Sequence, residues 1–261
     1  MLTSERLRAP AMGAAGVVVV VLAWWLLSVT LLREARVPTP GGVVSSILDD
    51  GWAYYWPNFS MTINEAVLGF LYGNVAAIAL ASLVLLVPQL EAVIMQVAVI
   101  SYCIPIVAIA PVLYIIIGIP DDGAASGTAV ALATLSVFFT TVIGTVLGLR
   151  SAERTSLDVV SVYGGGRLAQ LRKVQLVSAL PSVLNALQIA APAAFLGAIL
   201  GEYTGGLRPG VARVLVTAQQ NLNVERAWAT GLLCAAVAGA GFALFGIISR
   251  VVSPWSKGAQ A

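Results

Sequence analysis

Long apolar runs separated by short polar segments make up most of this chain. A run of about 20 apolar residues forms a helix long enough to cross the hydrocarbon core of a bilayer. Proline is tolerated in such a helix but bends it, so Pro105, Pro111, Pro181 and Pro192 predict kinks in their runs. The pattern predicts an all-α membrane protein with six spans, at about residues 12–32, 61–87, 90–117, 128–149, 178–201 and 227–252.

The segment 150–177 is a long polar stretch between two predicted spans. Glycines 164–166 permit a sharp turn in its middle. Apolar residues recur at helical spacing on both sides of that turn, at Leu157, Val160, Leu168, Leu171 and Val174. The spacing predicts two short amphipathic helices joined by a turn. From these residues alone, two interpretations have similar weight: a hairpin bound to anionic lipid headgroups, or a docking element for a partner.

Two other polar segments also carry helical spacing. In segment 33–60, the apolar positions Val44, Ile47 and Leu48 predict a short helix that lies on the membrane surface. The aromatic cluster 52–56 that follows is typical of residues at the lipid headgroups. In segment 202–226, a second short amphipathic element is expected. The turn at 118–127 is rich in glycine and predicts a flexible loop.

The distribution of basic residues predicts the orientation of the chain in the membrane. The first apolar run is long enough to span and lacks a following cleavage site, so we expect an uncleaved first helix. An even number of spans places both termini on one side. Basic residues are more numerous on that side, which predicts that it is cytoplasmic. They are Arg6, Arg8, Arg150, Arg154, Arg167, Arg172, Lys173, Arg250 and Lys257.

Composition narrows the chemistry that is possible. Apolar residues form 59% of the chain and charged residues only 10%, so its solvent must be lipid, and a net charge of +2 gives no argument for nucleic acid. The absence of histidine excludes serine–histidine and cysteine–histidine nucleophiles and most zinc sites. Cys103 and Cys234 lie in apolar runs, where we expect small buried hydrophobes and no metal site.

Polar residues inside the predicted spans are candidates for a translocation pathway, because such residues are costly in lipid. The candidates are Asn64, Glu65, Ser101, Tyr102, Gln188, Glu202 and Tyr203. For Asn74 and Asn185 we favour hydrogen bonds between helices instead. For Glu65 and Glu202 a wet position at the lip of the bundle fits as well as contact with a solute. Small residues such as Gly69 and Gly73 predict close helix packing.

The segment that begins at Asp158 reads DVVSVYGGGRLAQLRKVQLVSALPSVLNALQIA and resembles the signature loop of ABC-importer permeases. In that loop Glu-Ala-Ala is followed three residues later by glycine, and further on by Leu-Pro. Gly164 falls on the glycine, Asp158 on the glutamate and Pro181 on the proline. Val159 and Val160 replace the two alanines, so the signature is degenerate here. Asymmetric importers often pair one permease with a good signature and one with a degenerate signature, and a different permease as the partner of this chain therefore stays open.

Further matches extend this resemblance over most of the chain. Nitrate/sulfonate/taurine-type permeases have a Leu-Pro-x-Pro segment after their first helix, which is similar to VPTPGGVVSSILDDG here. Their second, third and fifth helices resemble MTINEAVLGFLYGNVAAIALASLVLLVPQLE, ISYCIPIVAIAPVLYIIIGI and FLGAILGEYTGGLRPGVARVLVTAQ. The resemblance implies a type I ABC importer permease, with one transmembrane domain over residues 1–261 in the inner or plasma membrane of a prokaryote.

In that family the signature loop forms coupling helices that fit a cleft on each subunit of a cytoplasmic ABC ATPase dimer. The resemblance therefore implies ATPase-coupling roles for Asp158, Tyr163, Gly164, Gly165, Arg167, Leu168 and Arg172. It implies two further partners, a second permease subunit (identical or different) and an extracytoplasmic solute-binding protein. The function it predicts is the permease of an ATP-driven importer, which forms the path for a small polar solute that the binding protein delivers.

The chain contains no Gly-x-x-x-x-Gly-Lys-Ser/Thr phosphate loop. We therefore expect that it is not an enzyme and binds no cofactor, and that ATP and Mg²⁺ bind to the partner ATPase. An intramembrane aspartyl enzyme is disfavoured because every aspartate lies in a predicted loop. The alternative of an ion-gradient-driven secondary transporter stays open, although it usually shows internal repeats and intramembrane ionisable residues.

Overall fold

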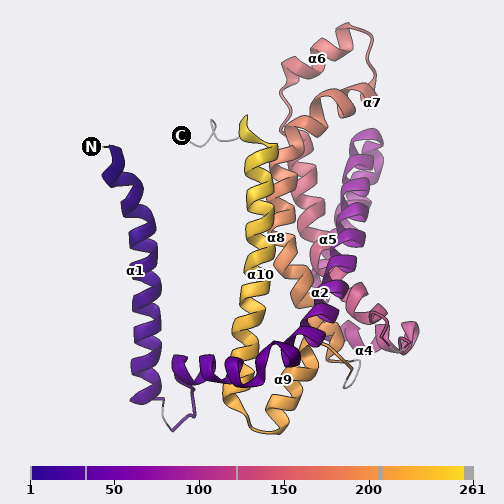
Figure 1. The fold of residues 1–261 in the computed structure, drawn as a ribbon. Helices are drawn as coiled ribbons and strands as arrows, with labels where there is room; N and C mark the ends of the chain where they lie inside the picture. Colours follow the sequence, from indigo (N-terminus) through magenta and orange to yellow (C-terminus); the bar gives the residue numbers. More distant parts are fainter. Residues whose placement is uncertain (1, 33, 122, 205–207, 256–261) are drawn as a thin grey trace. The chain divides into compact units, whose positions relative to one another are not determined.

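The structure is a computed structural model that describes residues 2–32, 34–121, 123–204 and 208–255, with side chains described from Met12 onward. Helices and short turns account for these residues (Figure 1). The helices are α1 (Leu2–Val29), α2 (Pro40–Leu86), α3 (Glu91–Cys103), α4 (Ile106–Ile117), α5 (Gly127–Arg150), α6 (Arg154–Val162), α7 (Arg167–Gln170), α8 (Leu176–Glu202), α9 (Val211–Gln220) and α10 (Val224–Val252). A 3₁₀ turn, Pro88–Leu90, precedes α3, and a π-helical turn, Leu171–Gln175, precedes α8.

The chain divides into two compact units. The first consists of Met1–Trp56 with Val214–Leu233, and the second of Pro57–Arg213 with Cys234–Ala261. Among the described residues, five helices are long and apolar enough to cross a membrane, and a sixth crossing is added if the bent pair α3–α4 is one span. The predicted all-α membrane fold is confirmed.

In the first unit, an ion pair joins the beginning of α2 to the beginning of α10. The guanidinium of Arg226 makes two hydrogen bonds to the carboxylate of Asp50, one of them 2.8 Å long from Nε to Oδ2. The hydroxyl of Tyr55 donates to the same Oδ2 atom at 2.9 Å. Arg226 also lies over the ring of Tyr54, 5.1 Å from its centroid. Because Arg226 is bidentate, this cluster holds the two helices in one geometry.

The surface helix predicted near residue 44 forms, but with a different buried face. Val43 is fully buried, whereas Val44 is 54% and Leu48 73% exposed. Within α2 a kink at Gly51, where φ is +70° and ψ is 170°, separates this short helix from the second span, as predicted. Trp52 and Trp56 stack on each other and remain exposed, as residues at the headgroup level do.

In the second unit, α5 packs along α8 and α2 at short interhelical distance. A Cβ atom at Gly197 of α8 would lie 2.8 Å from the Cα atom of Ala133 in α5. A Cβ atom at Gly73 of α2 would lie 2.6 Å from the carbonyl oxygen of Thr134 in α5. Glycine at these positions allows the backbones to approach closely, and the predicted packing role of Gly73 is confirmed. The hydroxyl of Thr141 donates to Asn74 Oδ1 at 2.5 Å, which confirms the interhelical bond predicted for Asn74.

The third predicted span is not one kinked helix but two helices. The chain bends by 98° between α3 and α4, at Ile104–Pro105, where the backbone is extended. At one end of the unit, Arg150 at the end of α5 forms an ion pair with Glu91 at the start of α3, at 2.5 Å. At the other end, Ser126, just before α5, donates its N–H to Glu65 of α2 at 2.6 Å. Residues 91–126 therefore cross the full length of the unit, so α3 and α4 together form one broken span.

Candidate functional site

The polar segment between α5 and α8 folds into a helical hairpin, which Figure 1 shows beyond the ends of these two helices. Its first arm is α6 and its second arm begins with α7. The turn between them needs glycine at Gly164, where φ is +76°. Gly165 donates its N–H to the carbonyl of Val160 at 2.8 Å. A Cβ atom on Gly165 would meet that same oxygen at 2.8 Å, so no larger residue fits.

A glutamine side chain braces the two arms of the hairpin. Nε2 of Gln170 donates to Ser161 Oγ at 2.8 Å and to the carbonyl of Leu157 at 3.2 Å. At its base, Leu171 is buried against Leu149 of α5 and Ala179 of α8. The hairpin is therefore attached to the ends of two spans. The sequence predicted the helix–turn–helix pattern but carried no signal for the role of Gln170.

The second arm is not a separate short helix, as predicted, but is continuous with the fifth span. The residues at both junctions, Gln170 and Leu171, and Gln175 and Leu176, have helical backbone angles. One apolar helical segment therefore runs from Arg167 to Glu202. The π-helical turn at 171–175 lies within it, and such turns are frequent at functional sites. This continuity makes α7 and α8 one mechanical element.

Large side chains at the tip of the hairpin are exposed, and no described residue of the second unit packs over them. Tyr163 is 87% exposed and Val162 is 84% exposed. The basic and acidic residues around them are exposed too, and in the described part of the chain none of them forms an ion pair; they are Arg154, Asp158, Arg167, Arg172 and Lys173. Leu168 is also exposed. An apolar tip surrounded by free charges suits contact with a protein surface.

The candidate pathway residues do not gather at one place. Asn64, Tyr102 and Tyr203 are exposed, while Ser101 and Gln188 are half-buried. Tyr102 stacks on Phe139 with ring centroids 4.5 Å apart. By contrast, Glu65 and Glu202 are buried together, 2% and 9% exposed, so neither has the wet lip position that was one of the two expectations. Asn185 is exposed on α8, contrary to the hydrogen bond expected there.

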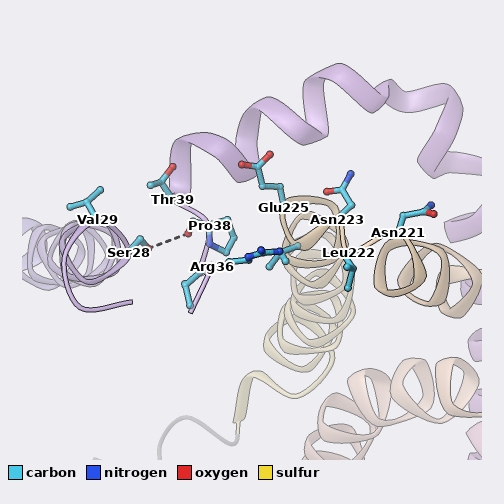
Figure 2. A pocket seen from close by; sticks show the side chains of 11 residues that line it. Ser28, Val29, Arg36, Pro38, Thr39, Asn221, Leu222, Asn223 and Glu225 are labelled. Atoms are coloured by element: carbon cyan, nitrogen blue, oxygen red, sulfur yellow. Dashed lines mark hydrogen bonds between the residues drawn. The ribbon is translucent and has the colours of Figure 1, made fainter. Parts of the chain in front are cut away.

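A polar groove lies in the first unit, between the end of α1 and the turn that joins α9 to α10 (Figure 2). Its volume is about 850 Å³. Ser28 Oγ closes one side by donating to the carbonyl of Pro38 at 3.1 Å. Arg36 and Leu222, both in the left-handed region with φ of +55° and +53°, line it. Such backbone conformations are uncommon for these residue types, and here two of them shape one groove.

Comparison with known proteins identifies the class. The chain belongs to the family of binding-protein-dependent transport system inner membrane components, whose model matches residues 69–258. It is therefore an inner-membrane permease subunit of an ABC importer. The family assignment favours the ATP-driven importer over the alternative of an ion-gradient-driven transporter. The matched range contains the whole hairpin.

Individual relatives agree with the family. A probable ABC transporter permease of Haemophilus influenzae is 30% identical over 182 residues, which is 70% of this chain and 72% of the relative. The formylaminopyrimidine transport permease ThiX of Halalkalibacterium halodurans is 24% identical, over 89% of this chain and 91% of its own. The riboflavin transport system permease RibX of Chloroflexus aurantiacus is 25% identical, over 96% and 92%. These relatives do not single out the nitrate/sulfonate/taurine type.

Proposed function

We propose that segment 150–177 is the coupling element through which a separate cytoplasmic ATPase drives this permease. The observation that carries the proposal is the continuous helical segment Arg167–Glu202, which joins the exposed hairpin directly to a spanning helix. A flexible loop would absorb a push at Tyr163. A helix that is braced by Gln170 and anchored by Leu171 transmits the push instead.

The transmission has a physical basis in the packing of α5 against α8. Glycine contacts between these helices leave no soft layer of long side chains, and closely packed helices move as rigid bodies. A displacement of the hairpin therefore tilts α5 and α8 together. Rigid-body rocking of this kind alternates the access of a transport path from one side of the membrane to the other.

The partners follow from this mechanism. The ATPase dimer supplies the energy and holds ATP and Mg²⁺, and the permease contributes positioning and the path but no catalysis. A second permease subunit, a copy of this chain or a different one, completes the path. An extracytoplasmic binding protein delivers the solute. The N- and C-termini and the hairpin lie on the cytoplasmic side, as the basic residues favour.

The solute class that fits best is a small polar, uncharged heterocycle. Two relatives are named for a pyrimidine and for riboflavin, both nitrogen heterocycles. The candidate pathway residues Asn64, Ser101, Tyr102, Gln188 and Tyr203 offer hydrogen bonds without fixed charge. They do not gather at one place, so their chemical type alone supports this solute class. Such side chains can hydrogen-bond to ring nitrogens and carbonyls, whereas a sulfonate would favour a positive group.

The test is purification of the tagged chain from its native membrane in mild detergent, followed by mass spectrometry of the proteins that accompany it. We expect an ATPase with a phosphate-binding loop in stoichiometric amount, and its loss when Tyr163 is replaced by Asp. Ser156→Asp is the matched control, because it introduces the same negative charge at an exposed position of α6 that lies away from the tip. Recovery of the chain without any ATPase would contradict the proposal.

The same preparation tests the solute class. A binding protein that accompanies the permease can be purified alone and its melting temperature measured with a pyrimidine, a flavin and taurine. Stabilisation by either heterocycle supports the proposed class. Stabilisation by taurine alone contradicts it, while leaving the coupling mechanism in place.

A further inference from the structure

Two buried carboxyl groups meet in the second unit, at the end opposite the hairpin. Glu65 lies on α2 and Glu202 is the last residue of α8, the helix that is continuous with the second arm of the hairpin. Their side chains are 2% and 9% exposed, and the two carboxyl groups interact directly. Both line a small cavity of about 30 Å³, which has room for water.

Hydrogen bonds account for three of the four carboxyl oxygens. Glu202 Oε1 accepts from the hydroxyl of Thr62, and Glu202 Oε2 accepts from the N–H of Ala212 at 2.9 Å. Glu65 Oε1 accepts from the N–H of Ser126. Glu65 Oε2 is buried and receives no hydrogen bond from any described residue. Because buried polar atoms are almost always paired, this one oxygen needs an explanation.

Two ionised carboxylates cannot lie in contact and out of water without large repulsion. A single proton removes the repulsion and turns the unpaired Glu65 oxygen into a donor to Glu202. The other groups that face the pair are Arg208, which lines the cavity and donates to the carbonyl of Asp121 at 3.1 Å, and Tyr203 and Cys234, which interact electrostatically with Glu202. Glu202 suits the ionised role, because it accepts from the first turn of α9, where the helix dipole favours a negative charge.

We propose that Glu65 and Glu202 share one proton, carried on Glu65 Oε2, and that this pair is a latch. Through Glu202 it holds the end of α8 and the start of α9. Through Glu65 it holds α2 and the residue before α5. Release of the proton restores the repulsion between two carboxylates and loosens all four elements at once. The latch thus lies at the far end of the helix that begins in the hairpin.

The experiment compares amide substitutions at the two positions in the purified full chain, by its melting temperature from tryptophan fluorescence at pH 7. In Glu65→Gln the amide oxygen still accepts from Ser126 and the amide N–H₂ donates to Glu202, so we expect a shift within about 2 °C. In Glu202→Gln an N–H₂ facing Ala212 meets a donor, and one facing Thr62 forces that hydroxyl to turn its proton to the carbonyl of Asn58 at 3.2 Å, so we expect a loss of roughly 5 °C or more. Glu34→Gln, at an exposed glutamate, is the matched control.

The pH dependence separates a shared proton from ordinary packing. Above about pH 4.3, the ordinary pKa of glutamate, the unfolded chain has released this proton, whereas the folded chain still holds it. The stability of the folded chain therefore falls as pH rises. We expect the melting temperature of the unsubstituted chain to fall by about 3 °C per pH unit from this pair, until the folded pair loses the proton. Glu65→Gln removes this slope, and Glu34→Gln keeps it.

Three outcomes would overturn the proposal. If Glu202→Gln is tolerated and Glu65→Gln is not, the proton is carried on Glu202 and not on Glu65. If the slope with pH is the same in Glu65→Gln and the unsubstituted chain, the pair does not share a proton. If sodium in place of choline at constant pH raises the melting temperature of the unsubstituted chain but not of Glu65→Gln, the occupant is a metal cation and not a proton.

Discussion

At the scale of single residues, the glycines of the hairpin turn have different roles although they are adjacent. Gly164 has a positive φ, Gly165 has no room for a side chain, and Gly166 has both an ordinary φ of −80° and no atom within 4 Å of an added Cβ. The sequence showed only that a turn was needed. It could not show which glycine is required for packing, because the carbonyl of Val160 approaches Gly165 only in the folded hairpin.

Replacement of Gly165 by alanine tests this difference. The added methyl group would meet the carbonyl oxygen of Val160 at 2.8 Å, which costs about 1–3 kcal/mol. Because 1–2 kcal/mol changes the ratio of formed to unformed turn by a factor of roughly 5–30, we expect the ATPase activity stimulated by the reconstituted permease to fall measurably. Membrane insertion should be unchanged.

Gly166→Ala is the matched control for that substitution, because alanine fits there without contact or strain. It should leave stimulated ATPase activity within about twofold of the unsubstituted permease. Equal activity of the two alanine variants would show that the turn geometry does not matter for coupling.

At the scale of elements, the helices that the apolar pattern predicted are present, and the differences lie where elements join. The apolar run at 90–117 did not reveal that Pro105 separates two helices, because hydropathy records only the composition of a span. The apolar pattern also did not reveal that α7 is continuous with α8. A helix can extend beyond the membrane through polar residues, and hydropathy does not detect that part of it.

The α5–α8 contact is the element-scale feature that rigid coupling requires. In Gly197→Ala the methyl group would lie 2.8 Å from backbone atoms of Leu132 and Ala133, so the two helices must separate. We expect the melting temperature of the purified chain to fall by roughly 3–10 °C. Gly231→Ala, on α10 with no atom within 4 Å of the added methyl, should change it little. An equal effect of both substitutions would argue against close α5–α8 packing.

At the scale of the whole molecule, the orientation in the membrane decides which surface meets the ATPase. We expect Ser156→Cys in α6 to react with a membrane-impermeant maleimide only after the cells are permeabilised. Asn221→Cys should react in intact cells. Both residues are exposed, and the background chain carries alanine at Cys103 and Cys234. The reverse pattern would place the hairpin outside and exclude ATPase coupling, and labelling of both from one side would show that the segment between them does not cross.

The sequence by itself determined that the solvent of this chain is lipid, which segments span it, and where its polar hairpin begins and turns. These properties depend on the composition and spacing of residues close together in the chain, so they can be predicted without coordinates. Only the tertiary structure decided that α3 and α4 are one broken span, that the second arm of the hairpin continues into α8, and that Glu65 and Glu202 are buried together. The broken span and the carboxyl pair depend on residues far apart in sequence, such as Glu65 and Glu202, whose proximity no local pattern records. The continuity of the second arm with α8 depends on backbone angles that hydropathy does not encode.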